Sequence, residues 1–246
     1  MLRRLLRRPI SENDPAFVPN NIPDAVAYRP YRGVRAVFHP WLIDKDIAGL
    51  MRHMHERGST TLVDWDRMAT LKWGFEQTAG LAGEVWELGV YRGGSALFLK
   101  RLMEKSAPPH PALRLFDSFE GLSAPVDGVD THKAGEFNDT SLDEVRALVG
   151  TDDFIDYRAG WVPDTFSGLG DKAIRFAHID LDLYQPILDA ANFVYERLVP
   201  GGVIVFDDYG FNSCPGARRA IDECFANRLE TPLALPTGQA LVVRRA

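Results

Sequence analysis

Two largely apolar segments that run into aspartates constrain the fold of this chain more than any other feature. Residues 174–179 lead into Asp180, and residues 203–206 lead into Asp207 and Asp208. Apolar runs of this length are typical of central strands in a parallel sheet. Parallel sheets present their functional groups at the carboxyl ends of the strands. If these two strands are neighbours, the three aspartates meet at one edge of the sheet.

A cluster of aspartates at one sheet edge predicts a metal site. Three crowded carboxylates repel one another unless a cation or shared protons neutralise them. Oxygen ligands favour a hard ion such as Mg²⁺. A lone aspartate after a strand is more often a simple cap, but a D-x-D and a D-D motif on two neighbouring strands favour the metal. We predict a Mg²⁺ site formed by Asp180, Asp207 and Asp208.

From about residue 64 the chain alternates between helix and strand patterns. Strands that alternate with helices imply right-handed crossovers, so we predict an α/β fold with a doubly wound, mostly parallel, seven-stranded sheet. The expected helices span about 42–56, 64–79, 93–104, 141–149, 185–198 and 216–227, and the expected strands span 84–90, 113–117, 153–158, 174–180, 202–207, 231–235 and 239–244.

The first 60 residues differ in pattern from the remainder. Residues 9–40 are rich in Pro and Asn and predict an extended arm. We expect residues 1–60 to form this arm and a helical extension, and residues 61–246 to form the main domain. Some arms of this kind wrap a neighbouring subunit and others lie free, so a homo-oligomer is one of two expectations. The long polar loop 123–140 is either a lid over the site or a surface excursion.

Charge and composition exclude several classes of function. The chain of 246 residues has a net charge of −6, which argues against nonspecific nucleic-acid binding because that binding depends on phosphate neutralisation. The arginine-rich start lacks a secretory apolar core, and no segment has the length of a membrane-spanning helix. Two cysteines give no disulfide framework. We therefore expect a cytoplasmic protein with reduced thiols.

A glycine-rich turn between the first strand of the sheet and the next helix predicts a ligand site. Glu87, Gly89 and Gly93 form a Glu-x-Gly-x-x-x-Gly pattern. The glycines allow a tight turn and close approach of a ligand, and the free amides at the helix start favour a negative group. This is not the G-x-G-x-x-G pattern of dinucleotide sites. A carboxylate ahead of the turn suits a ligand with both an amine and a carboxylate, such as the methionine part of S-adenosylmethionine.

Asp117 ends the next expected strand and strengthens the interpretation as a nucleoside site. An acidic side chain at this position can accept both hydroxyls of a ribose. Phe119 and Trp161 are candidates to pack on an adenine face, although either aromatic would also suit the core.

Together these motifs resemble the macrocin O-methyltransferase (TylF-like) family. The resemblance implies a Rossmann-like class I methyltransferase fold, S-adenosylmethionine and magnesium as cofactors, and methylation of a hydroxyl, typically on a sugar of a secondary metabolite. It runs from about residue 64 to the end of the sequence and rests on the segments Glu87–Gly94, Phe116–Leu122, Gly160–Trp161, Asp164–Thr165, His178–Tyr184, Phe206–Tyr209 and Cys214–Arg219.

The resemblance also implies roles for individual residues. Asp180, Asp207 and Asp208 match the metal ligands, and Asp182 matches the position of the general base. Asp180 and Asp182 would face one cleft only if the strand stays extended through both. His178 has the same parity and is the second candidate for the base, with a core histidine as the simpler interpretation. The expected cofactor contacts are Glu87, Gly89, Tyr91, Gly93, Ser95, Asp117, Ser118, Phe119, Gly160, Trp161 and Asp180.

Two other functions stay open from the sequence. A metal-dependent glycosyltransferase uses a D-x-D motif to bind a nucleotide sugar, which Asp180-Leu-Asp182 fits, although Glu87 would then have no role. A non-catalytic binding protein on the same fold is the other, since a fold does not determine a function. The acceptor, a small hydroxylated molecule that contains a sugar, is open as well: a macrolide sugar, an aminocoumarin sugar, a polysaccharide and a small phenol all fit.

Overall fold

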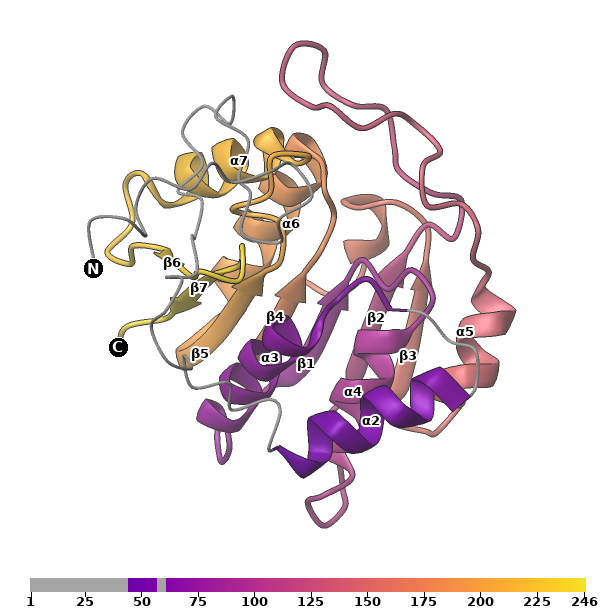
Figure 1. The fold of residues 1–246 in the computed structure, drawn as a ribbon. Coiled ribbons are helices and arrows are strands. Elements are labelled where there is room, and N and C mark those ends of the chain that lie inside the picture. The colour runs from indigo at the N-terminus through magenta and orange to yellow at the C-terminus, as the bar shows by residue number, and fades with distance from the viewer. Residues whose placement is uncertain (1–43, 57–60) are drawn as a thin grey trace, which may run out of the picture. The chain divides into compact units, whose positions relative to one another are not determined.

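The computed structural model describes residues 44–56 and 61–246. The arginine-rich start and the expected arm of residues 9–40 lie outside the described residues. Within them, seven strands form one sheet in the order β3-β2-β1-β4-β5-β7-β6 (Figure 1). The elements follow one another in the predicted alternation of helix and strand.

The sheet is mostly parallel. β1 to β5 run in the same direction, while β7 pairs antiparallel with β5, and β6 antiparallel with β7. The predicted α/β fold with a doubly wound, mostly parallel, seven-stranded sheet is therefore confirmed. The strands are β1 (Glu84–Leu88), β2 (Leu113–Asp117), β3 (Ile155–Ala159), β4 (Ile174–Ile179), β5 (Leu198–Phe206), β6 (Leu233–Ala234) and β7 (Ala240–Val243).

Helices cover both faces of the sheet (Figure 1). Alternate residues of a strand point to opposite faces, so Val85 and Phe176 enter one buried cluster while Trp86 and Ala177 enter the other. None of the described helices is both long and apolar enough to cross a membrane. The first cluster includes residues of α2 (Lys45–Glu56), α3 (Trp65–Gln77), α4 (Gly94–Met103) and α5 (Leu142–Val149), and the second those of α6 (Tyr184–Arg197), α7 (Pro215–Phe225) and a short 3-10 helix, Asp164–Phe166, that the sequence patterns did not predict.

Helix α2 shares the core of the main domain. Its residues Ile47, Leu50 and Met54 lie in the same buried cluster as α3 and α4. The expected division at residue 60 assigned this helix to the extension. We propose instead that the domain begins at α2.

The order of the strands changes direction beside β1. The chain passes from β1 to β2 and β3 on one side, and then crosses to β4 and β5 on the other. A crevice for ligands forms at such a point, outside the carboxyl ends of the strands. The strand ends are joined here by hydrogen bonds: Asp180 N–H donates to the carbonyl of Leu88 (2.8 Å), and Asp207 N–H donates to that of Ile179 (2.9 Å).

Candidate active site

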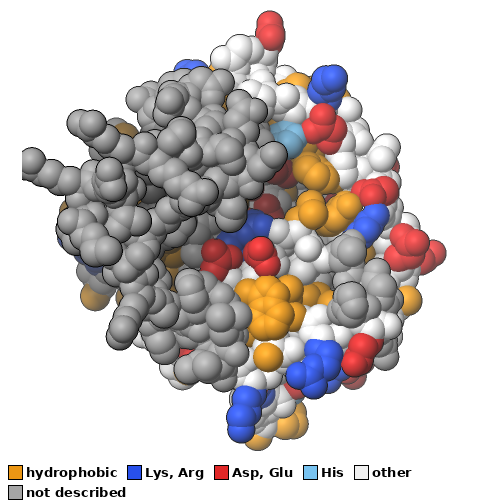
Figure 2. Space-filling model, in the orientation of Figure 1, with side chains coloured by type: hydrophobic (Ala, Val, Ile, Leu, Met, Phe, Trp, Pro, Cys, Tyr) orange, Lys and Arg blue, Asp and Glu red, His pale blue; other side chains and the backbone are white. Residues whose placement is uncertain are grey.

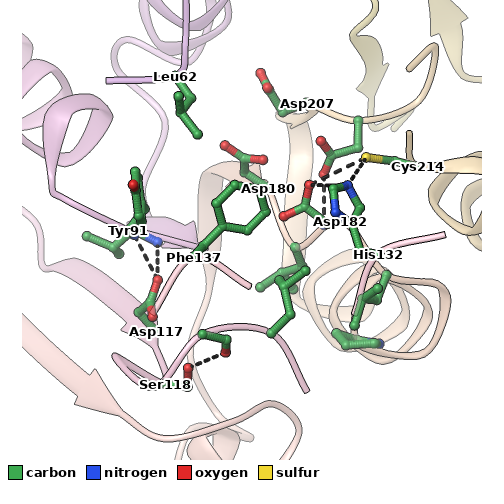
Figure 3. A pocket seen from close by; sticks show the side chains of 18 of the residues that line it. Leu62, Tyr91, Asp117, Ser118, His132, Phe137, Asp180, Asp182, Asp207 and Cys214 are labelled. Carbon is green, nitrogen blue, oxygen red and sulfur yellow. Dashed lines mark hydrogen bonds and ion pairs between the residues drawn. The ribbon is translucent and has the colours of Figure 1, made fainter. Parts of the chain in front are cut away.

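A cavity of about 280 Å³ opens at the carboxyl ends of β1, β2, β4 and β5. Small-molecule sites in proteins have volumes of roughly this size or larger. Asp117 lies at one end of the cavity, and Asp182, His132 and Cys214 lie together at the other, with Asp180 between them (Figure 3). The cavity therefore joins the predicted nucleoside site to the predicted metal site.

Gly89 allows the ends of β1 and β4 to approach each other. Its φ is +90°, and a Cβ atom there would lie 1.7 Å from the carbonyl oxygen of Asp180. Any side chain at this position would force the two strand ends apart. The chain then turns into α4, whose first residues Gly94 and Ser95 line the cavity. Free amides at the start of a helix favour a negatively charged group.

Asp117 organises the turn that follows β1. Its Oδ2 accepts hydrogen bonds from the N–H groups of Val90 and Tyr91 (both 2.8 Å), and its Oδ1 accepts one from Phe119 N–H (2.7 Å). A carboxylate oxygen has two lone-pair sites. Oδ2 therefore has both of its sites occupied, whereas Oδ1 can still accept one ligand hydroxyl.

The predicted cofactor contacts divide into two groups. Glu87 is buried, Gly93 packs against Val145 and Val149, and Phe119 packs against the core. Trp161 is 43% exposed, so it has room to stack on a ligand. The predicted contacts that line the cavity are Gly89, Tyr91, Ser95, Asp117, Ser118, Gly160, Trp161 and Asp180.

The predicted metal ligands converge, but in two overlapping groups. Ligand atoms of Asp180, Asp182 and Asp208 lie within 4.8 Å of one another, and so do those of His178, Asp180 and Asp207. Asp180 belongs to both groups. The expected triad is therefore divided: Asp208 faces Asp182, whereas Asp207 faces His178.

Asp207 is neutralised by its protein neighbours. Its side chain is 1% exposed, forms an ion pair with Arg67 and accepts a hydrogen bond from Gln239 Nε2 (2.8 Å). Nε2 of His178 lies 3.6 Å from Oδ1 of Asp207. Burial raises the pKa of Asp207, but His178, Arg67 and Gln239 together bring it below its ordinary value. Asp207 is therefore a carboxylate at neutral pH.

Asp180 and Asp208 have the opposite electrostatic surroundings. Burial raises the pKa of both carboxyl groups well above the ordinary value, and repulsion by neighbouring aspartates raises it further. The negative charge of such a site has to be neutralised, either by a bound cation or by protonation of the carboxylates. Because the donors are all oxygens, they fit Mg²⁺.

Asp182 reaches the cavity in an unexpected way. β4 ends at Ile179, and Asp182 has a φ of +59°, so the strand does not stay extended through Asp180 and Asp182 and the condition stated from the sequence is not met. The turn instead folds Asp182 back, and its N–H donates to Oδ2 of Asp208 (3.0 Å). Burial raises the pKa of Asp182. The nearby His132 and a hydrogen bond from Cys214 lower it by less, so the pKa stays above its ordinary value.

His178 occupies the interior beneath the cavity. It is fully buried, and its Nδ1 lies 2.9 Å from Oε1 of Glu87, which is also fully buried. Burial lowers the pKa of His178, but Asp207 and Glu87 raise it to about 10. The histidine is therefore a buried cation at neutral pH, in keeping with the core interpretation rather than with a base that accepts protons from a substrate.

Four residues that the sequence reasoning assigned no role also belong to the site. Arg67 and Gln239 bond to Asp207, and His132 and Cys214 lie beside Asp182. Cys214 is the first residue of one of the segments that carry the family resemblance, and nothing else in the sequence indicated that it belongs to the site. The other three reach the site from α3, the loop 123–140 and the segment before β7, and no local pattern marks them.

A family model of macrocin-O-methyltransferase (TylF) matches residues 53–238. The chain belongs to the macrocin-O-methyltransferase (TylF) family. The match begins within helix α2, ahead of the expected boundary at residue 60, and covers every residue of the candidate site named above except Gln239. The resemblance stated from the sequence motifs is confirmed.

Characterised relatives of this TylF-family chain act on different natural products. A tetracenomycin 4'-O-methyltransferase of Streptomyces olivaceus, whose substrate carries a dimethoxyrhamnosyl group, is 31% identical over 172 residues, with 64% of this chain and 65% of the relative covered. Mycinamicin III 3''-O-methyltransferase of Micromonospora griseorubida is 29% identical, with 58% and 61% covered. The chain thus spans somewhat less than two thirds of the length of these relatives.

Solved structures support the fold. The O-methyltransferase NovP superposes with a TM-score of 0.67 at 22% identity, with 76% of this chain and 84% of NovP covered. The calicheamicin methyltransferase CalS11 superposes with a TM-score of 0.63 at 15% identity, with 85% of this chain and 98% of CalS11 covered. The Rossmann-like class I methyltransferase fold expected from the resemblance is therefore confirmed.

Proposed function

We propose that this protein transfers a methyl group from S-adenosylmethionine to a hydroxyl group, with Mg²⁺ as its metal cofactor. The observation that carries the proposal is that Asp180 and Asp208 line the same cavity as Asp117 and the turn at Gly89. A nucleoside site and a cation site in one cavity suit a direct displacement, in which alignment of the two reactants supplies much of the catalysis.

The residues at the nucleoside end fit S-adenosylmethionine. Oδ1 of Asp117 has one acceptor site left for a ribose hydroxyl. Oε2 of Glu87 is a buried oxygen without a hydrogen-bond partner in the part of the chain that is described, and it would accept a hydrogen bond from the amine of the cofactor, directly or through water. Tyr91, Gly160 and Trp161 would surround the adenosine. When bound, the cofactor supplies an activated methyl group.

The carboxylates fit Mg²⁺. We propose Asp180, Asp207 and Asp208 as its ligands, and the raised pKa values of Asp180 and Asp208 support a cation at this point. Arg67 would have to release an oxygen of Asp207, because the two side chains form an ion pair. When bound, the metal makes a nearby hydroxyl easier to deprotonate.

Asp182 is the proposed proton acceptor. Its carboxylate lines the cavity, and burial raises its pKa above the ordinary value. A general base works best when its pKa is close to the working pH. The hydrogen bond from the Cys214 thiol to Oδ1 of Asp182 (3.4 Å) fixes the direction of the carboxylate.

We propose a small, sugar-containing acceptor. The name of the tetracenomycin relative includes a rhamnosyl group, and the wall of the cavity includes apolar side chains such as Leu62 and Phe137 that suit the faces of rings. Figure 2 shows acidic and basic side chains interspersed on the visible part of one face, and this pattern together with the net charge of −6 disfavours a nucleic-acid partner. A cytoplasmic location and a homo-oligomer remain part of this proposal.

The test is a screen of hydroxylated acceptors for release of S-adenosylhomocysteine, in magnesium and in excess chelator. We expect release only with an acceptor that carries a free sugar hydroxyl, and only with magnesium. Turnover that is unchanged in chelator would contradict the metal-dependent mechanism. Calorimetric titration with S-adenosylmethionine and with a nucleotide sugar separates the methyltransferase from the glycosyltransferase, which would bind only the latter.

A further inference from the structure

A second group of ligand atoms, of a different chemical kind, lies beside the predicted magnesium site. It consists of Nε2 of His132, Oδ1 of Asp182 and Sγ of Cys214 (Figure 3). The sulfur lies 3.4 Å from the oxygen and 3.6 Å from the nitrogen, and the nitrogen lies 3.9 Å from the oxygen. All three residues line the cavity.

These distances match the spacing of ligands around a tetrahedral ion. With Zn²⁺ bond lengths of about 2.0 to 2.3 Å, pairs of ligands lie roughly 3.3 to 3.6 Å apart. The two distances that involve the sulfur fall in this range. The nitrogen–oxygen pair, expected at about 3.3 to 3.5 Å, is longer by roughly 0.5 Å, so the two side chains would have to close slightly on the ion. An imidazole, a thiol and a carboxylate favour zinc over magnesium, which prefers oxygen alone.

The three residues come from segments that hydrogen bonds hold together. Asp130 Oδ1 accepts a hydrogen bond from Tyr184 N–H (2.9 Å), which ties the loop 123–140 to the turn that carries Asp182. Thr131 Oγ1 donates to the carbonyl of Ser213 (2.6 Å), which ties the same loop to the residue before Cys214. The residues that flank the group therefore fix it in place.

His132 is oriented as a metal ligand. Its Nδ1 lies 2.5 Å from Oε2 of Glu136, and the hydrogen bond from His132 lowers the pKa of Glu136, which is therefore an anionic acceptor. With the proton on Nδ1, the lone pair of Nε2 faces Asp182 and Cys214. A histidine held by a carboxylate behind it is the usual arrangement at zinc sites.

We propose that His132, Asp182 and Cys214 bind Zn²⁺, and that the bound ion inhibits methyl transfer. Binding breaks the S–H bond of Cys214, forms a zinc–sulfur bond and releases one proton to solvent, so that a thiolate and a carboxylate balance the charge of the ion. Asp182 is then held by the ion and cannot accept the proton of the acceptor. The inhibition rests on the function proposed above, whereas the zinc site itself does not.

The site is tested by titration of the full chain with Co²⁺, a spectroscopic substitute for zinc, in excess magnesium to saturate the all-oxygen site. We expect one equivalent of cobalt to give a near-ultraviolet thiolate-to-cobalt charge-transfer band, which added zinc abolishes. The band is lost in Cys214→Ser. Cys224→Ser is the matched control, since Cys224 is buried in α7 beside Arg228 and Asn192, and it keeps the band.

Zinc affinity, measured by competition with a chelator, gives an independent readout. We expect a loss of at least about 100-fold in His132→Gln, and of roughly 10-fold in Glu136→Gln, which removes only the carboxylate behind the histidine. Glu136 is partly exposed, so its variant is expected to fold. A wild-type chain without the band, or the same band and affinity in Cys214→Ser, would overturn the zinc site.

Inhibition is tested on the release of S-adenosylhomocysteine, with each variant compared with its own zinc-free rate. Zinc should lower the rates of the wild type and of Cys224→Ser below their zinc-free rates. The rate of Cys214→Ser should stay at its own zinc-free value. Equal inhibition of all three overturns the regulatory role. A cobalt band in a chain that methylates no acceptor would support the zinc site and count against the proposed function, so the two failures are distinguishable.

Discussion

The aspartates of the cavity differ in their neighbours, and the difference separates their roles. Asp207 faces Arg67 and His178 and is ionised. Asp182 has a raised pKa and faces the cavity. A carboxylate already paired with two cations is a weak base, which supports the proposal of Asp182 rather than Asp207 as the proton acceptor.

We predict that Asp182→Asn slows the chemical step by about 100-fold or more, since a positioned base contributes roughly that factor. The amide keeps an oxygen that can accept the hydrogen bond from Cys214, so the local structure should persist. The measurement is the single-turnover rate with saturating cofactor and acceptor. Affinities for S-adenosylmethionine and magnesium, which should stay near the wild-type values, are the control. An unchanged rate would assign the base to another group.

Substitution of the buried Glu87 tests the proposed cofactor site. In Glu87→Gln the hydrogen bond to His178 can persist, but the buried histidine loses half of its counter-charge, and the free oxygen no longer carries charge for the cofactor amine. We predict an affinity for S-adenosylmethionine about tenfold weaker, equivalent to one hydrogen bond to a charged group, by calorimetric titration. If affinity is unchanged and only the Tm falls, Glu87 acts on His178 alone.

The sequence predicted the aspartates well because their positions follow from strand patterns. Asp180, Asp207 and Asp208 come directly after apolar strands, and parallel strands end at one edge. Strand parity does not account for the position of Asp182, which depends on a left-handed turn instead. His132 was not predictable, because its approach to Asp182 depends on hydrogen bonds of a long loop.

The loop 123–140 is part of the site rather than a surface excursion alone. His132 and Phe137 line the cavity, and Asp130 caps a helix of the main fold. The residue before α6 is Leu183, which has no capping side chain. Asp130 supplies the missing acceptor through its hydrogen bond with Tyr184 N–H.

We predict that Asp130→Ala lowers the free energy of unfolding by about 1 kcal/mol, the usual effect of losing a helix cap, and raises the KM of the acceptor. The measurements are urea unfolding and steady-state kinetics. Asp130→Asn is the control, because its amide oxygen can still accept from Tyr184 N–H. A raised KM in both variants alike would mean that the charge of Asp130 matters, and not its capping bond.

Helix α2 has a cap whose strength depends on pH. Oδ1 of Asp44 accepts from the N–H groups of Asp46 (2.9 Å) and Ile47 (3.1 Å), and Lys72 of α3 pairs with Asp44 and Asp46. Burial raises the pKa of Asp44, but the hydrogen bonds from Lys72 and the two amides bring it below the ordinary value of 3.8. A lowered pKa in the folded state stabilises the protein above pH 3.8, and this stabilisation is lost as the pH falls through the folded pKa.

We therefore predict that Asp44→Ala lowers the free energy of unfolding by about 1 kcal/mol at neutral pH, and by less as the pH falls well below 3.8. The measurement is urea unfolding at neutral pH and at a pH well below 3.8. Asp44→Asn keeps a cap acceptor but no charge, so its effect should be smaller at neutral pH. An effect of Asp44→Ala that is equal at both pH values would show that the ionised carboxylate contributes nothing.

Patterns of apolar residues predicted the strands and helices because the central strands are buried on both faces. All six residues of β4 are buried, including Arg175 and His178. The prediction was less accurate at the edge of the sheet, where β6 is only Leu233–Ala234 and both residues are exposed. The 3-10 helix Asp164–Phe166 has too few residues for a periodic pattern.

The carboxylates that line the cavity at the carboxyl end of the sheet destabilise the folded protein. Asp208 is buried, and its pKa is raised well above the ordinary value by burial and then by the charges of Asp182 and Asp207. A group with a raised pKa contributes its full stability below its unfolded pKa, and loses it as the pH rises through the folded pKa. Above the ordinary pKa, burial of the Asp208 carboxyl therefore opposes folding unless a cation is bound.

This leads to opposite effects of Asp208→Asn on stability and on function. The amide replaces a buried ionisable group and keeps an oxygen to accept from Asp182 N–H, so we predict a Tm in chelator about 2 to 4 °C above that of the wild type, equivalent to roughly 1 kcal/mol for a chain of this size. Magnesium at 100 times its Kd should stabilise the wild type by about 2.7 kcal/mol and the variant far less, with loss of turnover. The measurement is thermal unfolding with and without magnesium. If magnesium raises the Tm of both proteins equally, the ion binds elsewhere and the carboxylate cluster has another purpose.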